Sequence, residues 1–159
     1  MAEKILHQDA VFISKATSQK ALFAEVFEQL SHLGYVKGDY SQELIKHEAV
    51  APTGIVTTPV ARRLPNIAVP HLQKACFYRD LLVPIRCDGV PFGNMLTPSQ
   101  QVPVGFVFLL LTTDAPARTA LLARVVGLLK AVPPEQLRAF LNSKDPAFIY
   151  SFCCQHLPE

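Results

Sequence analysis

The segment Val104 to Leu111 constrains the fold more than any other part of this chain, because it is apolar throughout. A strand with one solvated face alternates apolar and polar residues, whereas a strand covered on both faces is a continuous apolar run. The run is much too short to cross a bilayer as a helix, which takes about 20 apolar residues. We therefore expect a central strand in a sheet that is covered on both faces.

The composition indicates one folded domain over residues 1–159. Half of the residues are hydrophobic and 18% are charged, a balance typical of packed globular chains and not of disordered ones. The net charge is only +2 and the lysines and arginines are scattered, so the basic stripe of a nucleic-acid-binding protein is missing. Since Met1–Lys4 leads into no apolar signal segment, we expect a cytoplasmic protein with no direct membrane contact.

The rest of the pattern predicts helices before, between and after the strands. Strands are predicted at residues 10–14, 66–70, 75–79, 81–86 and 104–111, with 75–79 and 81–86 either separate or one bent strand. Helices are predicted over residues 19–33, after a capping box of Asp39 and Gln42, and after Asp114, Pro134 and Asp145. The proline-rich residues 51–65 are expected to form a loop or a short interrupted strand, and Asp88-Gly89 and Gly93-Asn94 to form turns.

The cysteines are expected to be reduced and structural. Cys76, Cys87, Cys153 and Cys154 show no disulfide spacing, and adjacent cysteines rarely bridge each other. Cys153 and His156 lie three residues apart on a predicted helix and would suit a shared metal, but a buried thiol beside a surface histidine explains them as well. We expect no metal site, and we expect His7, His32 and His156 at the surface.

His71 is the main candidate for chemistry. Ile67, Ala68 and Val69 are typical of a buried strand, and Pro70 removes a backbone donor, so the strand should end or reach a sheet edge there. The imidazole would then lie on a rigid strand end, where a fold commonly exposes a reactive group. The alternative is a surface histidine or one whose hydrogen bonds are satisfied in the core.

The sequence around His71 resembles a known signature. The segments Lys46-His47-Glu48, Pro52-Thr53-Gly54-Ile55 and Ile67-Ala68-Val69-Pro70-His71, in this order and spacing, resemble the fructose/mannitol-type enzyme IIA domains of the bacterial phosphoenolpyruvate-dependent sugar phosphotransferase system. Further segments extend the resemblance to about residues 10–155: Val90-Pro91-Phe92, Phe106 to Leu111, Thr113-Asp114 and Leu121-Leu122. Within the family, the pattern looks most like the galactitol-type branch.

The resemblance implies both a fold and an activity. The fold would be an α/β three-layer sandwich, with a mixed sheet of about five strands flanked by helices on both faces. His71 would accept a phosphoryl group on Nε2 from the histidine-containing phosphocarrier protein and pass it to a cysteine of an enzyme IIB partner. That partner would serve a membrane enzyme IIC permease for a hexitol-like, galactitol-like sugar. No cofactor and no metal are expected.

Two residues depart from the family pattern. His47 stands where the family usually has an arginine, and Arg118 stands where many members have a second active-site histidine, which the galactitol-type branch also lacks. We expect His47, Thr53, Gly54 and Arg118 to support the phosphoryl group. The alternatives are turn chemistry for Thr53-Gly54, an exposed helix end for His47 and a solvated surface residue for Arg118.

Two other functions fit the same residues. Nitrogen-type enzyme IIA proteins and domains of sugar-responsive transcription regulators share the Pro-His strand end, so a phosphorylation-dependent regulatory module not coupled to transport is the alternative. A degenerate interaction domain that is never phosphorylated is the third possibility, because the arginine usually found before Glu48 is missing.

Overall fold

The centre of the molecule is a long antiparallel hairpin made by β5 (Leu81–Gly93) and β6 (Gln101–Leu111). The computed structural model describes residues 5–72 and 77–157. The hairpin pairs Leu81 with Leu111 at one end and Gly93 with Gln101 at the other. The predicted strand at 104–111 is therefore confirmed and is longer than expected.

A bulge in β5 replaces one of the predicted turns. The register shifts between Arg86 and Val90, where Gly89 has a φ of 64°, so Asp88-Gly89 bends the strand without ending it. The buried Arg86 side chain donates hydrogen bonds to the carbonyls of Cys87 and Gly105 and pairs with the Asp88 carboxylate at 3.0 Å. The prediction of a turn at 88–89 was wrong, because a glycine at positive φ serves a bulge as well as a turn.

Short strands complete a mixed six-stranded sheet with the order β1-β5-β6-β3-β2, and β4 also pairs with β6. β1 (Phe12–Ile13) runs parallel to β5, while β3 (Asn66–Ala68) and β4 (His71–Leu72) run parallel to β6. β2 (Gly54–Ile55) is antiparallel to β3, so the proline-rich segment does contain a short strand. The predicted strand at 10–14 is shorter than expected. The predicted strand at 75–79 lies partly outside the described residues, and its Phe77 forms only an isolated bridge with Val36.

Five helices are described: α1 (Gln19–His32), α2 (Ser41–Val50), α3 (Ala115–Ala131), α4 (Pro134–Leu141) and α5 (Pro146–His156). Asp114 and Asp145 cap α3 and α5 with their carboxylates, as predicted. The capping box at Asp39 and Gln42 was wrong. Tyr40 occupies the N-cap position of α2 without a side-chain capping bond, and the Asp39 carboxylate instead accepts a hydrogen bond from the Ser41 N–H in a local turn before the helix.

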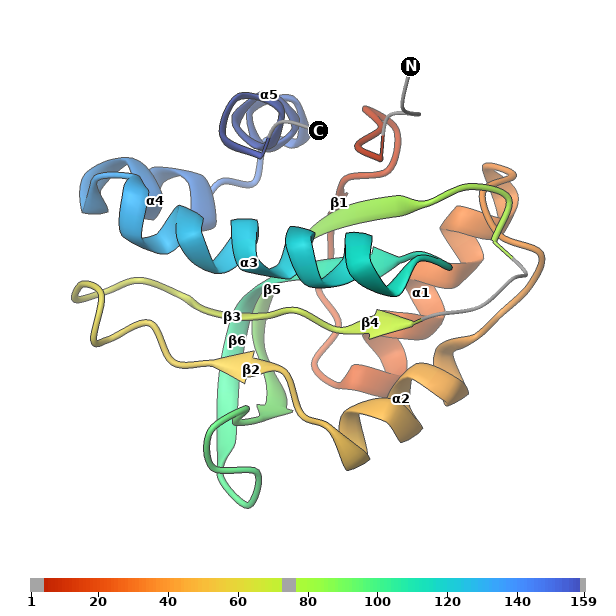
Figure 1. The fold of residues 1–159 in the computed structure, drawn as a ribbon, viewed down its shortest axis with the longest axis horizontal. Coiled ribbons are helices and arrows are strands. Elements are labelled where there is room, and N and C mark those ends of the chain that lie inside the picture. The colour runs from red at the N-terminus through yellow and green to blue at the C-terminus, as the bar shows by residue number, and fades with distance from the viewer. Residues whose placement is uncertain (1–4, 73–76, 158–159) are drawn as a thin grey trace.

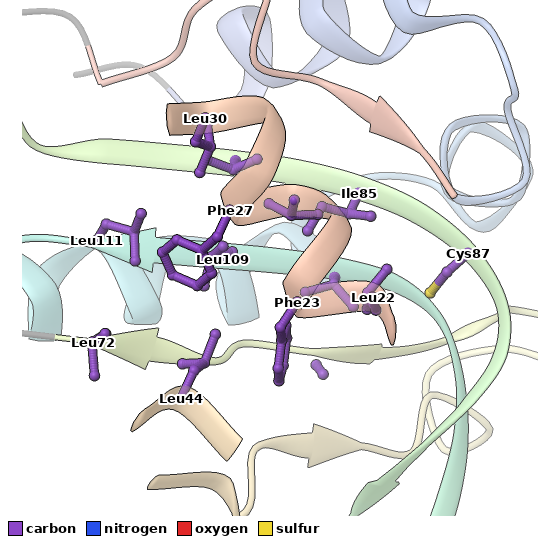
Figure 2. Close-up of a cluster of buried hydrophobic side chains, with 14 of the residues drawn as sticks. Leu22, Phe23, Phe27, Leu30, Leu44, Leu72, Ile85, Cys87, Leu109 and Leu111 are labelled. Carbon is purple, nitrogen blue, oxygen red and sulfur yellow. The ribbon is translucent and has the colours of Figure 1, made fainter. Parts of the chain in front are cut away.

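Two hydrophobic cores cover the two faces of the sheet. Val107, Leu109 and Leu111 of β6 belong to the core under α1 and α2, which Figure 2 shows with Leu22, Phe27 and Leu44. The alternating β6 residues, Phe106, Phe108 and Leu110, belong to the core under α3, α4 and α5. Helices therefore flank a mixed sheet on both faces, and the predicted α/β sandwich is confirmed.

The burial of the cysteines and of the histidines away from His71 can be compared with the predictions. Cys87 and Cys153 are buried, Cys154 is exposed, and all three carry free thiols, while Cys76 lies outside the described residues. His32 is exposed as predicted. The surface prediction was wrong in part for His7 and His156, which are half-buried against the rings of Tyr35 and Phe152.

Candidate functional site

His71 is held by sheet pairing, immediately after a break in a strand. β3 ends at Ala68, so the predicted strand 66–70 is shorter than expected, and pairing with β6 resumes at His71 in a separate strand. The break follows from Pro70, which has no N–H, but the Pro70 carbonyl still accepts a hydrogen bond of 3.0 Å from the Leu110 N–H. His71 is therefore the first residue of β4, not the last residue of β3, and its backbone is fixed on both sides.

The His71 imidazole is oriented by one hydrogen bond. Its Nδ1 lies 3.1 Å from the Val69 carbonyl oxygen, and because a carbonyl only accepts, Nδ1 carries the hydrogen. In the neutral ring, Nε2 then has the lone pair. Burial lowers the pKa of His71 below 6.5, and the bond to Val69 only partly opposes this, while the charges of His47 and Arg118 lower the pKa further. The ring is thus neutral at pH 7 and nucleophilic at Nε2.

His47 lies directly beside His71. It comes from the last turn of α2, and the two imidazoles meet edge to face with their ring centroids 4.9 Å apart. Its Nδ1 is buried and has no hydrogen-bond partner among the described residues. His47 is half-buried, so it is not the fully exposed helix end that was the alternative.

Arg118 approaches the same histidine from the opposite layer. It lies in the first turns of α3, and its charge acts on the His71 imidazole. Figure 1 shows β4 between the start of α3 and α2, the two helices that carry Arg118 and His47. Arg118 also lines a pocket of about 190 Å³ together with Asp80, Leu110, Thr112 and Arg124.

Thr53 belongs to the framework of the site. Its hydroxyl donates to Glu48 Oε2 at 2.8 Å and its N–H donates to Glu48 Oε1 at 3.1 Å. Its carbonyl accepts a hydrogen bond from the Val69 N–H at 3.3 Å. Since the hydroxyl hydrogen is used by Glu48, any contact of Thr53 with a phosphoryl group would involve other atoms.

Glu48 is the residue that sequence reasoning missed. It is buried, and desolvation raises its pKa to about 7 even though both hydrogen bonds from Thr53 lower it. Its motif Lys46-His47-Glu48 was noted only for the resemblance. The available signal was the position of Glu48, four residues after Leu44 and therefore on the apolar side of the predicted helix.

Gly54 is required by a close approach of two backbones. A Cβ atom on Gly54 would lie 2.6 Å from the Gly93 carbonyl oxygen, at the end of β5. The Gly54 carbonyl also accepts a hydrogen bond of 2.8 Å from the Met95 N–H in the loop after β5. This packing accounts for the glycine without a ligand, and its contact with a phosphoryl group stays a prediction.

The sequence matches the family described as "Phosphoenolpyruvate-dependent sugar phosphotransferase system, EIIA 2" over residues 4–155. The chain belongs to this enzyme IIA family. The resemblance read from the motifs around His71 is therefore confirmed at the level of the family. Nothing in the match distinguishes its branches, so the galactitol-type assignment stays a prediction. A comparison with curated protein sequences gives no match.

Solved structures share the fold of this enzyme IIA chain. Nitrogen regulatory protein IIA-Ntr from Neisseria meningitidis superimposes with a TM-score of 0.65 at 20% identity, covering 92% of this chain and 94% of that one. Mannitol IIA from Escherichia coli gives a TM-score of 0.65 at 20% identity, with 91% and 97% covered. The complex of E. coli mannitol IIA with phosphorylated mannitol IIB gives 0.63 at 20% identity, with 91% and 95% covered.

The described residues of the enzyme IIA chain offer neither a metal-ligand cluster nor a membrane-spanning helix. Over residues 5–72 and 77–157, no group of three or more His, Cys, Asp or Glu side chains is arranged to hold a metal ion. In the same part of the chain, no helix combines the length and apolar character needed to span a bilayer.

Proposed function

We propose that this enzyme IIA chain is a cytoplasmic phosphocarrier that takes a phosphoryl group on Nε2 of His71 and passes it on. The donor would be the histidine-containing phosphocarrier protein, and the acceptor a cysteine of an enzyme IIB that serves an enzyme IIC permease. The observation that carries the proposal is the His71 ring itself, with Nδ1 bonded to the Val69 carbonyl and a pKa lowered by burial.

The transfer needs positioning more than it needs acid or base catalysis. The Nε2 lone pair attacks phosphorus in line, while the bond from phosphorus to the donor's ring nitrogen breaks and its electron pair returns to that ring. Nδ1 keeps its hydrogen throughout. The phosphorylated ring carries positive charge, which the Val69 carbonyl stabilises through the Nδ1 hydrogen bond. In the second step, a cysteine thiolate of the acceptor attacks phosphorus and His71 leaves as neutral imidazole.

Nearby cations would neutralise the phosphoryl oxygens. Arg118 is always protonated and binds phosphate oxygens in bidentate fashion, so it replaces the usual arginine better than His47 does. His47, in ring contact with His71, adds charge only when protonated. Backbone groups of Thr53 and Gly54 complete the proposed phosphoryl site.

Membership of the enzyme IIA family supports the proposed acceptor and the proposed sugar. E. coli mannitol IIA, which has the same fold, forms a complex with phosphorylated IIB. The order and spacing of the motifs favour the galactitol-type branch, which also lacks a second active-site histidine at the position of Arg118, and the proposed substrate of the system is therefore hexitol-like. Onward transfer from phosphorylated chain to galactitol-type and mannitol-type IIB proteins, measured side by side, tests the branch. Faster transfer to mannitol-type IIB would contradict the galactitol assignment.

Phosphorylation of His71 is the decisive test. Incubation with phosphoenolpyruvate, enzyme I and the phosphocarrier protein should add one acid-labile phosphate, and His71→Ala should abolish it while the fold persists. His32→Ala is the matched control, because His32 is exposed and should not affect labelling. Labelling that persists in the His71→Ala protein would overturn the assignment.

We propose that no metal takes part on this subunit. Transfer from a carrier that is already phosphorylated should proceed at the same rate in excess chelator. Because the carrier is already phosphorylated and enzyme I is absent from this step, a loss of rate with chelator would place a metal in the transfer itself.

The second candidate is a phosphorylation-dependent regulatory module, which the likeness to the Neisseria meningitidis nitrogen regulatory protein favours. Such a module would accept phosphate on His71 but pass none to an IIB cysteine. Neighbouring IIB and IIC genes would favour transport, and an isolated gene or a nitrogen-regulation cluster would favour signalling. A degenerate interaction domain would fail to take up phosphate at all.

A further inference from the structure

A chain of hydrogen bonds runs from α2 to the reactive ring. The Glu48 carboxylate accepts from the Thr53 N–H and hydroxyl, at 3.1 and 2.8 Å. The Thr53 carbonyl accepts from the Val69 N–H at 3.3 Å, and the Val69 carbonyl accepts from His71 Nδ1 at 3.1 Å. Four residues that are separated in sequence are thereby joined in one continuous path that ends on the imidazole.

The Val69 carbonyl is the group in this path whose orientation is held only by its neighbours. It belongs to the peptide unit between Val69 and Pro70, and because Pro70 has no N–H, that unit has no donor of its own to anchor it. Its orientation therefore depends on its neighbours: the Val69 N–H bonded to Thr53 on one side, and the Pro70 carbonyl bonded to the Leu110 N–H on the other. The first of these anchors is set by Glu48.

Because the residues of this path are buried, the hydrogen bonds between Glu48 and Thr53 cannot easily be replaced by bonds to water. Glu48 is 3% exposed, Thr53 2% and Val69 1%, so water cannot readily replace a lost partner. A buried donor left without an acceptor costs free energy, and the Thr53 segment would shift to find another partner. Such a shift would move the Thr53 carbonyl, to which the Val69 N–H is bonded. The Val69 carbonyl, which accepts the hydrogen bond from the His71 ring, would move with it.

We propose that Glu48 is a positioning residue for His71, setting the tautomer and orientation of the imidazole through the Thr53 and Val69 backbone. The inference rests on the proposed phosphocarrier function, because only a reactive Nε2 makes the tautomer matter. With Nδ1 hydrogen-bonded, Nε2 stays unprotonated and faces its reaction partner. Without the anchor, the ring exchanges tautomers and part of the protein carries its hydrogen on Nε2.

The test compares Glu48→Ala, Glu48→Gln and Thr53→Val with the wild type. The tautomer of His71 is measured in the unphosphorylated protein from the ¹⁵N chemical shifts of the ring, and single-turnover transfer is measured from the charged phosphocarrier protein. Glu48→Ala should reduce the Nδ1–H tautomer and slow transfer about ten- to a hundredfold, the range typical when a partner that orients a histidine is removed. Glu48→Gln should keep the wild-type tautomer and transfer rate, because its amide can accept a hydrogen bond from the Thr53 N–H and donate one to the Thr53 hydroxyl.

A matched control separates positioning from stability. Glu25→Ala removes a carboxylate that accepts from the Ser14 hydroxyl at 2.9 Å, away from the path to His71, and should leave the tautomer and the transfer rate unchanged. If Glu48→Ala does not fold, Thr53→Val carries the test. It loses the hydroxyl bond and keeps the N–H bond, so a smaller shift in the same direction is expected.

A wild-type His71 tautomer in the folded Glu48→Ala or Thr53→Val protein would overturn the inference and leave Glu48 a structural residue only. Failure of the proposed function would look different, because the wild type itself would take up no phosphate. The tautomer of the unphosphorylated protein would still decide whether Glu48 positions the ring.

Discussion

At the scale of single residues, His71 is kept neutral by its surroundings and needs no separate base. Burial is the largest cause of its lowered pKa, and the charges of His47 and Arg118 act in the same direction. A protonated His71 would be a half-buried cation close to other cations, so the neutral form is favoured. The charges that are proposed to bind a phosphoryl group therefore also favour the neutral, nucleophilic form of His71 at neutral pH.

The pKa of His71 should respond to its neighbours. In the wild type, His71 should titrate below pH 6.5, and both His47→Ala and Arg118→Ala should raise its pKa, because each removes a charge that opposes protonation. An NMR titration of the ring protons measures this, with His32→Ala as the exposed control. A His71 pKa that stays the same in both variants would show that burial and the bond to Val69 set it without the two neighbouring charges.

The same two residues should differ in their effect on rate. Loss of one charge-assisted contact to the phosphoryl group corresponds to roughly 1–3 kcal/mol, so Arg118→Ala should slow single-turnover transfer about ten- to a hundredfold. His47→Ala should slow transfer less at pH 8 than at pH 6, because a histidine is mostly neutral at the higher pH. A wild-type rate for Arg118→Ala with no pH effect for His47→Ala would leave the phosphoryl group to backbone groups near Gly54.

At the scale of elements, the sequence predicts what is determined locally. The apolar run of β6 and the aspartate caps of α3 and α5 depend on neighbouring residues, and they were predicted correctly. β1, β2 and β4 are two-residue strands whose bounds depend on pairing with β5, β3 and β6, so local patterns indicated a strand near β1 and near β2 but not where each begins and ends.

In the candidate site, too, only the features determined by local sequence were predicted. His71 was found from its motif, whereas its ring contact with His47 requires α2 to pack along β4. The role of Glu48 appears only when the chain folds back so that Thr53 meets both Glu48 and Val69. Contacts of this kind depend on long-range packing, which composition and spacing do not specify.

Gly54 offers a test of how tightly β2 packs. Gly54→Ala places a Cβ 2.6 Å from the Gly93 carbonyl oxygen, and because both groups are backbone, a strand must move. We expect a loss of about 1–3 kcal/mol in the free energy of unfolding, measured with urea. Gly127→Ala is the matched control: it has open space in α3 and should stabilise the protein by about 0.5–1 kcal/mol. A wild-type stability for Gly54→Ala would show that the hairpin end adjusts freely.

At the scale of the whole molecule, the buried carboxyl of Glu48 links stability to pH. Its pKa is about 7 in the folded protein against 4.5 in the unfolded chain, so between these values the folded state holds a proton that the unfolded state has released. The contribution of Glu48 to the free energy of unfolding is therefore fully present below about pH 4.5 and is lost as the pH rises through 7.

Comparison with Glu48→Gln isolates this effect, because the amide does not titrate. The stability of the wild type relative to Glu48→Gln should fall by roughly 2–4 kcal/mol between pH 4.5 and pH 8. Urea unfolding at several pH values measures it. Parallel pH profiles for the two proteins would contradict the raised pKa of Glu48.

The β5–β6 hairpin has a consequence for the order of folding. Its strands are neighbours in sequence, whereas the parallel pairings of β3 and β4 with β6 close long stretches of chain, which makes their formation slower. Mutations in the hairpin should therefore slow folding, and mutations in β3 and β4 should mainly speed unfolding, as φ-values would show; the opposite pattern would contradict this order. A nascent or partly folded chain would then contain the hairpin but no oriented imidazole, so the chain would acquire its capacity for phosphate only at the last stage of folding.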